Sequence, residues 1–255
     1  MKAGSFQTIK NRLQSGFTLL ELLIAITIFA VIATLVYSTF NAVISKTDAI
    51  KEESAVNEMA AACLNRISMD LHALYVEQYP LYEPSDYDDD SDPYRFVGET
   101  EYIGGDQFPR LGFASTEHLP MSGQRPPASG DSGAVHSGLA RIRYHVDKPE
   151  GAAPDSGYVL KRWETPWPYD DSDEIGRDPE KAPVLCTDIS ELKFIYLDEQ
   201  GDEFETWDSD AEDMDYATPR AVQVSLKIDI KGRQYPFSTR VVLPVFREPL
   251  EDVKK

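Results

Sequence analysis

Hydrophobic residues follow three different patterns along this chain. From 16 to 40 they form a nearly unbroken run, GFTLLELLIAITIFAVIATLVYSTF, which contains one carboxylate, Glu21. From 41 to 78 apolar positions recur at near-helical spacing, with charged residues between them. Beyond about 139, apolar and polar residues alternate over short segments, a pattern typical of strands. The sequence therefore predicts an α+β fold, in which a long N-terminal helix packs on an antiparallel β-sheet domain.

The segment 17–40 is long enough to cross a lipid bilayer as a helix, which takes about 20 apolar residues. A carboxylate in hydrocarbon is costly, so Glu21 requires a partner or a function. A cut after Gly16 would leave an amino group on Phe17, about 6 Å along a helix from Glu21. Such charges attract each other, within one chain or between neighbouring subunits of a filament. The leader 1–16 has no acid, and its basic residues are Lys2, Lys10 and Arg12.

The run Gly16-Phe17-Thr18-Leu19-Leu20-Glu21 resembles the type IV prepilin motif. The resemblance implies a pilin-like fold, a prepilin peptidase that cuts after Gly16 and methylates Phe17, and a role for Glu21 in assembly. A plain signal anchor is the alternative. A cleaved secretory signal peptide is disfavoured, because its apolar region has about 7–15 residues and its cleavage site follows that region.

Residues 41–78 are expected to extend the same helix, as far as about Val76. They contain no glycine or proline, and Pro80 would end the helix. The apolar residues would form one stripe against a globular domain. These residues are Ile50, Met59, Cys63, Ile67, Leu71 and Leu74.

Residues 79–138 are rich in Asp, Pro, Gly and Ser, and we expect loops here with one or two short strands. The short apolar pieces at 95–97 and 111–113 are the candidates for those strands. At the other end of the chain, residues 247–255 are expected to form a charged, frayed tail.

Residues 139–246 are expected to form the antiparallel β domain. The alternation is clearest at 221–230, and a turn at 231–233 predicts a hairpin with 234–243. Pro236 predicts that the return strand lies at a sheet edge or contains a bulge. The other predicted strands are 141–146, 158–163 and 189–198.

Three features of this region resemble the J-type minor pseudopilin of type II secretion: a strand ending in Tyr-x-Asp at 192–198, a loop with Trp207, and a Pro-x-Ala-Val strand at 219–226. The resemblance implies a structural subunit, not an enzyme, that joins the K, I and H types at the tip of the pseudopilus and helps to initiate its assembly. Other implied partners are the major pseudopilin, the prepilin peptidase and the inner-membrane assembly platform.

Two other functions stay open. A minor pilin of a type IV pilus or competence system is the alternative of the same class. A membrane-tethered periplasmic calcium-binding or hydrolytic domain is the alternative of a different class.

The formal net charge of −19 argues against nucleic acid as a partner, because such binding relies on cations that neutralise phosphates. The leader contributes +3, so the remainder of the chain carries −22. Basic flanks tend to stay on the cytoplasmic side of a membrane. We therefore expect a single-pass inner-membrane protein with its C-terminal domain in the periplasm.

Acidic runs raise the question of calcium, which prefers several oxygen ligands. Asp88, Asp90 and Asp92 form one candidate set, and Asp171 and Asp173 form another. The first set has a proline where an EF-hand loop needs glycine, and both lack the closing glutamate. Solvated acidic loops are therefore the favoured interpretation, and no cofactor is expected.

The segment Gly130-Asp131-Ser132-Gly133 reads like the nucleophile segment of a chymotrypsin-like protease. That mechanism also needs a histidine base and an aspartate that orients it. Because the segment lies in a linker rich in Pro, Ser and Gly, a flexible loop is the favoured interpretation.

Cys63 and Cys186 are the two cysteines of the chain, too few for a disulfide framework. Two buried thiols are the favoured interpretation. A single bridge is the alternative, which an oxidising compartment permits.

Overall fold

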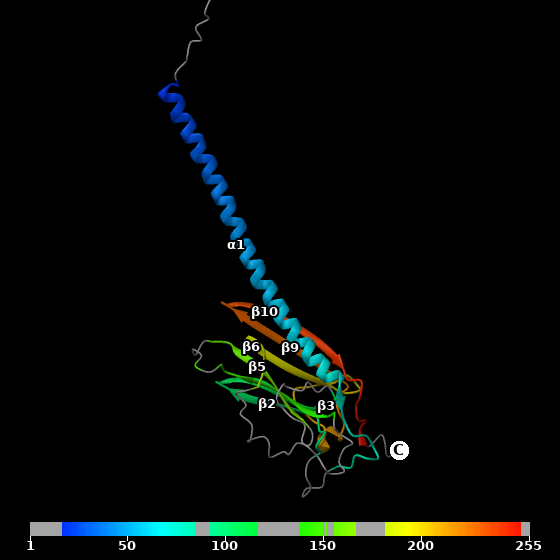
Figure 1. The fold of residues 1–255 in the computed structure, drawn as a ribbon. Coiled ribbons are helices and arrows are strands. Elements are labelled where there is room, and N and C mark those ends of the chain that lie inside the picture. The colour runs from blue at the N-terminus through cyan, green and yellow to red at the C-terminus, as the bar shows by residue number, and fades with distance from the viewer. Residues whose placement is uncertain are drawn as a thin grey trace, which may run out of the picture. The chain divides into compact units, whose positions relative to one another are not determined.

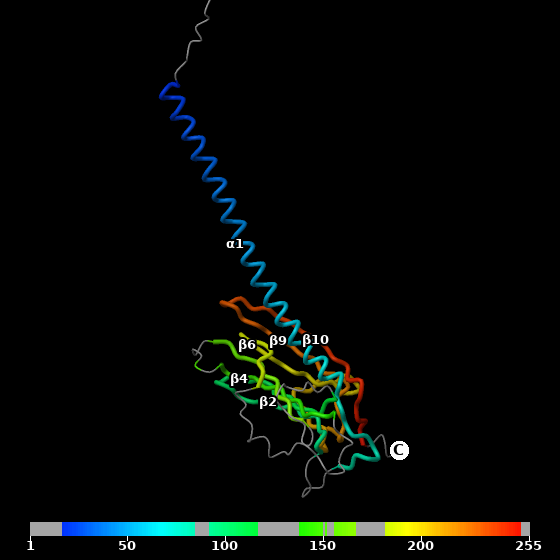
Figure 2. Tube along the Cα trace, viewed as in Figure 1, coloured from blue at the N-terminus to red at the C-terminus, as the bar shows by residue number. Residues whose placement is uncertain are grey.

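The structure, a computed structural model, describes residues 17–84, 92–116, 138–149, 151, 156–166 and 182–250 (Figure 1 and Figure 2). The chain divides into two compact units, residues 1–54 and 55–255, and each is described by itself. One helix, α1 (Leu19–His72), contributes to both units.

In the first unit, α1 has no core of its own. Every residue from Leu19 to Ile50 is exposed, including the apolar ones. Ile50, which we expected in the stripe that faces the globular domain, is among them. In the second unit, α1 buries one side, with positions three or four residues apart, as a helix packed on a sheet requires. The buried residues are Val56, Ala60, Cys63, Ile67, Asp70 and Leu71.

The predicted end of the helix, at about Val76, is wrong by about a turn, since α1 ends at His72. Leu74 and Tyr75 form a short strand, β1, that pairs with Ser115 and Ala114. Leu74 and Val76 are buried while Tyr75 is only partly so, which is the alternation of a strand. Backbone pairing with a distant strand therefore ends the helix before Pro80 is reached.

The second unit contains one antiparallel sheet in the described part of the chain. Its order is β10-β9-β6-β5-β4-β3-β2-β8, with β1 paired to β3 and β7 to β6. The bounds are β1 Leu74–Tyr75, β2 Val97–Ile103, β3 Asp106–Ser115, β4 Ala140–Asp147, β5 Tyr158–Pro166, β6 Val184–Leu197, β7 Glu203–Phe204, β8 Trp207–Asp208, β9 Ala221–Ile230 and β10 Arg233–Val242. A 3-10 helix, η4 (Glu212–Met214), lies between β8 and β9.

The predicted hairpins of the C-terminal half are confirmed. β4 pairs with β5, and β9 pairs with β10. Lys231 and Gly232 in the connecting turn both have positive φ, as a tight two-residue hairpin turn requires. β10 lies at the edge of the sheet, which is where Pro236 can omit a ladder hydrogen bond.

The strands in two regions are longer than the sequence predicted. The described part of 79–138 contains two strands, as predicted, but β2 and β3 have 7 and 10 residues and form a full hairpin. β3 pairs with β2, β4 and β1, so neighbouring strands stabilise a polar sequence that has little strand pattern of its own. β6 begins at Val184, before the predicted start at 189, and continues past an irregularity near Asp188, which has positive φ.

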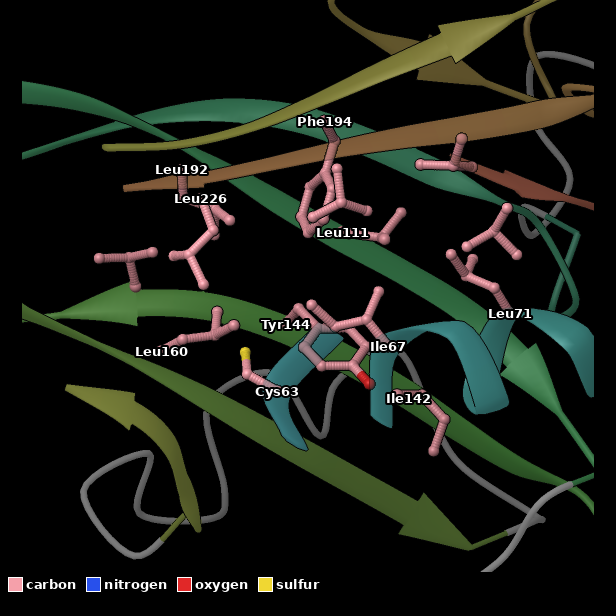
Figure 3. Close-up of a cluster of buried hydrophobic side chains, with 14 of the residues drawn as sticks. Cys63, Ile67, Leu71, Leu111, Ile142, Tyr144, Leu160, Leu192, Phe194 and Leu226 are labelled. Atoms are coloured by element: carbon pink, nitrogen blue, oxygen red, sulfur yellow. The ribbon is translucent and has the colours of Figure 1, made fainter. Parts of the chain in front are cut away.

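The core lies between α1 and one face of the sheet. Figure 3 shows Cys63, Ile67 and Leu71 of α1 among side chains from the sheet. The aromatic residues Phe96, Phe113 and Tyr196 also belong to this core. The prediction of a frayed tail from residue 247 is wrong at its start, because Arg247 is 1% exposed.

Candidate assembly site at the start of the helix

The start of α1 has a defined cap. The Thr18 hydroxyl accepts a hydrogen bond from the Glu21 backbone N–H at 3.3 Å, and the Thr18 carbonyl accepts one from the Leu22 N–H at 3.2 Å. A Thr with a Glu three residues later is the spacing of a capping box. We did not predict this role for Thr18, although the T-x-x-E spacing was present in the sequence. The cap explains why the helix begins directly after the proposed cleavage point.

Phe17 and Glu21 both lie at the start of α1. Phe17 directly precedes the cap and is exposed, and Glu21 lies in the first turn of α1. A negative charge in the first turn interacts favourably with the helix dipole. Gly16 lies outside the described residues, as do the basic residues of the leader.

The segment from Leu19 to Phe40 presents apolar side chains on all sides. Its large apolar residues are more than half exposed, from Leu20 near the start to Phe40 at the end. By length and composition α1 is apolar enough to cross a membrane, so this segment fits a single-pass anchor. This apolar surface can be buried only against lipid or against other helices.

The threonine hydroxyls in this segment have hydrogen-bond acceptors within the helix itself. The hydroxyls of Thr27, Thr34 and Thr39 donate to backbone carbonyls three or four residues earlier, at 2.8–2.9 Å. This pattern lets a polar side chain sit in hydrocarbon without an unpaired donor. In the part of the chain that the structure describes, no basic side chain pairs with the Glu21 carboxylate. Glu21 is therefore the group in this segment that still calls for a partner.

A buried polar cluster connects the second half of α1 to the sheet. Asp70 is fully buried, and its carboxylate accepts hydrogen bonds from Arg66, Arg162 and the Tyr144 hydroxyl. Arg162 also pairs with Glu164 at 2.5 Å. Burial, together with the Asp70 charge, raises the pKa of Tyr144 well above its ordinary value, so its hydroxyl remains a donor. Sequence reasoning missed this cluster, because charged residues between the apolar positions of a helix are normally expected on its solvent-exposed side.

The calcium candidates have different outcomes. Asp92 is buried, and its carboxylate accepts hydrogen bonds from Arg247 at 2.9 Å and from the Tyr94 backbone N–H at 2.8 Å. Asp88, Asp90, Asp171 and Asp173 lie outside the described residues. Within the described ranges, no group of three His, Cys, Asp or Glu side chains is arranged to hold a metal ion. The favoured interpretation, solvated acidic loops without calcium, stays a prediction.

The protease segment around Ser132 also lies outside the described residues. His72, which the same chemistry would have drawn upon, is on the exposed side of α1, with its Nδ1 2.6 Å from the Ser68 carbonyl oxygen. Trp207 is buried, and its indole N–H donates to the Ala217 carbonyl at 2.9 Å, which is a packing role.

Comparison with known protein families agrees with this geometry. Residues 11–37 match the prokaryotic N-terminal methylation motif, and residues 38–234 match the family of type II secretion system (T2SS) protein J. A search of curated proteins found no match. The second match covers most of the chain and takes in the sheet as far as the start of β10. The chain therefore belongs to the protein J family of the type II secretion system and is a minor pseudopilin.

Proposed function

We propose that this pseudopilin is a subunit of the pseudopilus tip complex and helps to initiate pseudopilus assembly. The observation that carries the proposal is the exposed apolar half of α1, whose single carboxylate, Glu21, lies one turn from Phe17. Family membership implies processing of the prepilin and assembly with other pseudopilins. The partners that fit the tip position are the K, I and H types and, below them, the major pseudopilin.

The proposed mechanism of assembly rests on charge pairing in a medium of low dielectric constant. After cleavage behind Gly16, the methylated amino group of Phe17 would provide a positive charge at nearly the depth of Glu21. An ion pair in such a medium is much stronger than the same pair in water. Helices would then associate side by side, and the pairing of Glu21 with the amine of its neighbour would set their axial register. The prepilin peptidase and the inner-membrane assembly platform would act before this step.

The proposed location is the inner membrane, with the β domain in the periplasm. The basic leader and the acidic remainder support this orientation, because positive flanks tend to stay in the cytoplasm. We also propose that the protein acts as a structural subunit and catalyses no reaction. The match to the protein J family favours secretion over a type IV pilus or a competence system.

The Glu21 carboxylate provides the central test. Glu21→Gln and Glu21→Ala should leave cleavage largely intact, yet lower the recovery of partner pseudopilins in a pull-down by about tenfold or more, the effect of about 1.4 kcal/mol. Thr34→Ala is the matched control, because its hydroxyl is satisfied within the helix. Normal recovery of partners with both Glu21 variants would contradict the proposal.

The processing step has a separate test. Intact mass of the membrane-extracted protein, with sequencing of its N-terminal peptide, should show a chain that starts at methylated Phe17. Gly16→Leu should block the cut and retain the leader. An intact Met1 in cells with an active prepilin peptidase would mean that the segment is only an anchor.

A further inference from the structure

The two cysteines of the chain both lie in the core of the β domain. Cys63 is on α1 and Cys186 is on β6, far apart in the sequence, and each is 1% exposed. Both belong to the same hydrophobic core. The favoured interpretation, two buried thiols, agrees with the structure, in which both cysteines are free and buried.

Two contacts place the segments that carry these residues together. The Thr187 hydroxyl, next to Cys186, donates to the Met59 sulfur, one turn before Cys63, at 3.6 Å. Cys186 pairs with Leu160 in the β5–β6 ladder, and Figure 3 shows the Cys63 sulfur directed into the core beside Leu160.

We propose that Cys63 and Cys186 form a disulfide in the mature protein. In this step one thiolate attacks the disulfide of a periplasmic thiol–disulfide oxidase, which gives a mixed disulfide. The second thiolate then displaces the oxidase and closes the bond. The two thiols lose two protons and two electrons, and the oxidase is reduced to its dithiol.

The bond must form before the core closes. In the folded chain both sulfurs are shielded from any protein oxidant. The neighbouring Cys186 and burial raise the pKa of Cys63, whereas Cys63 lowers the pKa of Cys186. The obstacle to thiol–disulfide exchange in the folded chain is therefore burial. Oxidation therefore accompanies folding, and the folded, reduced protein should react slowly.

The position of the bond has a mechanical consequence. β6 lies inside the sheet, between β5 and β9, and α1 is continuous from Leu19 through Cys63. A covalent link at Cys63 would pass a pull on the apolar half of α1 directly to the middle of the sheet. The presence of an oxidase at this domain rests on the periplasmic orientation proposed above.

The state of the thiols can be measured on the full-length protein. Membranes are quenched with acid and denatured, treated with iodoacetamide, and the protein is analysed by intact mass before and after reduction. We expect no adduct before reduction and two afterwards. Because the chain has two cysteines in all, the number of adducts gives the state of both thiols directly, without any variant.

Single variants extend the same test. Cys63→Ala and Cys186→Ala should each give one adduct without reduction. The reductant should lower the thermal midpoint of the native protein by several degrees, and it should leave the midpoint of the double variant unchanged. The double variant is therefore a matched control for effects of the reductant elsewhere in the chain.

A refolding experiment distinguishes a failure of the disulfide proposal from a failure of the proposed periplasmic orientation. The purified full-length protein is reduced, denatured and refolded in detergent with oxidised and reduced glutathione. A bond that forms on refolding but not in cells would support the cysteine pair and count against the periplasmic orientation. Two free thiols under both conditions would overturn the pair and leave the assembly proposal untouched.

Discussion

The carboxylate of Asp70 on α1 and the guanidinium of Arg162 on β5 form a buried ion pair, with Nε–Oδ2 and Nη2–Oδ1 distances of 2.6 and 3.2 Å. Arg66 approaches the same carboxylate at 2.5 Å, and the Tyr144 hydroxyl donates to it. Asp70 and Glu164 thus balance the two arginines, and the cluster holds the last turns of α1 on the sheet.

Removing one charge from this cluster should destabilise the β domain. Asp70→Ala leaves Arg162 buried without its partner, which in other proteins costs about 3–5 kcal/mol. Chemical denaturation of the full-length protein in mild detergent, followed by tryptophan fluorescence, would measure the loss. Glu191→Gln is the control, because the Glu191–Lys227 pair is partly exposed and such pairs contribute about 0–1 kcal/mol. Equal effects of the two variants would refute the assigned role of Asp70.

Arg247 should tolerate no replacement, not even by lysine. Its guanidinium donates to the Tyr216 carbonyl at 2.7 Å, to Asp92 and to the Ser209 carbonyl, and it lies 3.3 Å from the centre of the Tyr82 ring. Lysine keeps the charge but lacks the planar set of donors. Arg247→Lys should therefore lower the free energy of unfolding by about 1.5–3 kcal/mol.

The control for Arg247 is Arg240→Lys on the exposed edge strand β10. Thermal unfolding should separate the two variants clearly. A midpoint for Arg247→Lys that equals that of Arg240→Lys would contradict the role given to the tail.

Stability should fall in mild acid because of His145. Burial lowers the pKa of this side chain, and its Nε2 is buried without a hydrogen-bond partner in the described part of the chain. The unfolded chain therefore binds the proton more readily than the folded one. The stabilising contribution of neutral His145 is present above the ordinary pKa of about 6.5 and is lost as the pH falls below it.

Thermal midpoints at pH 7.5 and 5.5 would test this prediction. His145→Gln should show a smaller drop than the native protein, whereas His72→Gln, on the exposed side of α1, should behave like the native protein. Asp147, Lys161, Arg110 and Glu101 act on the same imidazole, so their charges must be retained in both variants. An identical drop in all three proteins would contradict the assignment.

Gly98 on β2 should be sensitive to a single methyl group. A Cβ at this position would lie 2.1 Å from the hydroxyl oxygen of Tyr196 and 2.2 Å from its ring, and Tyr196 is fully buried. Overpacking of this kind costs about 1–3 kcal/mol. Gly98→Ala should lower the denaturation midpoint, whereas Gly112→Ala, whose nearest contact would be 3.7 Å away, should change it little. A tolerant Gly98→Ala variant would mean that Tyr196 can move.

Several features could be predicted from the sequence because they depend on neighbours along the chain. The apolar run around Glu21 defines a helix that needs lipid or other helices, whatever the rest of the protein does. The alternation at 221–230, the turn at Gly232 and the proline at 236 likewise define a hairpin and its edge strand. Each signal is local, and each is found where it was predicted.

The long-range features were decided by the tertiary structure. From the sequence alone, Asp70 would be assigned to the solvent-exposed side of a helix. In the fold its carboxylate is buried against Arg162 of β5 and Tyr144 of β4. Arg247 reads as part of a charged tail, because its partners come from segments distant in the sequence. β1 ends the helix because β3 offers it backbone partners. The sequence by itself thus determined the anchor, its acid and the strand pattern, whereas only the packing of α1 on the sheet decided which charges are buried and brought both cysteines into one core.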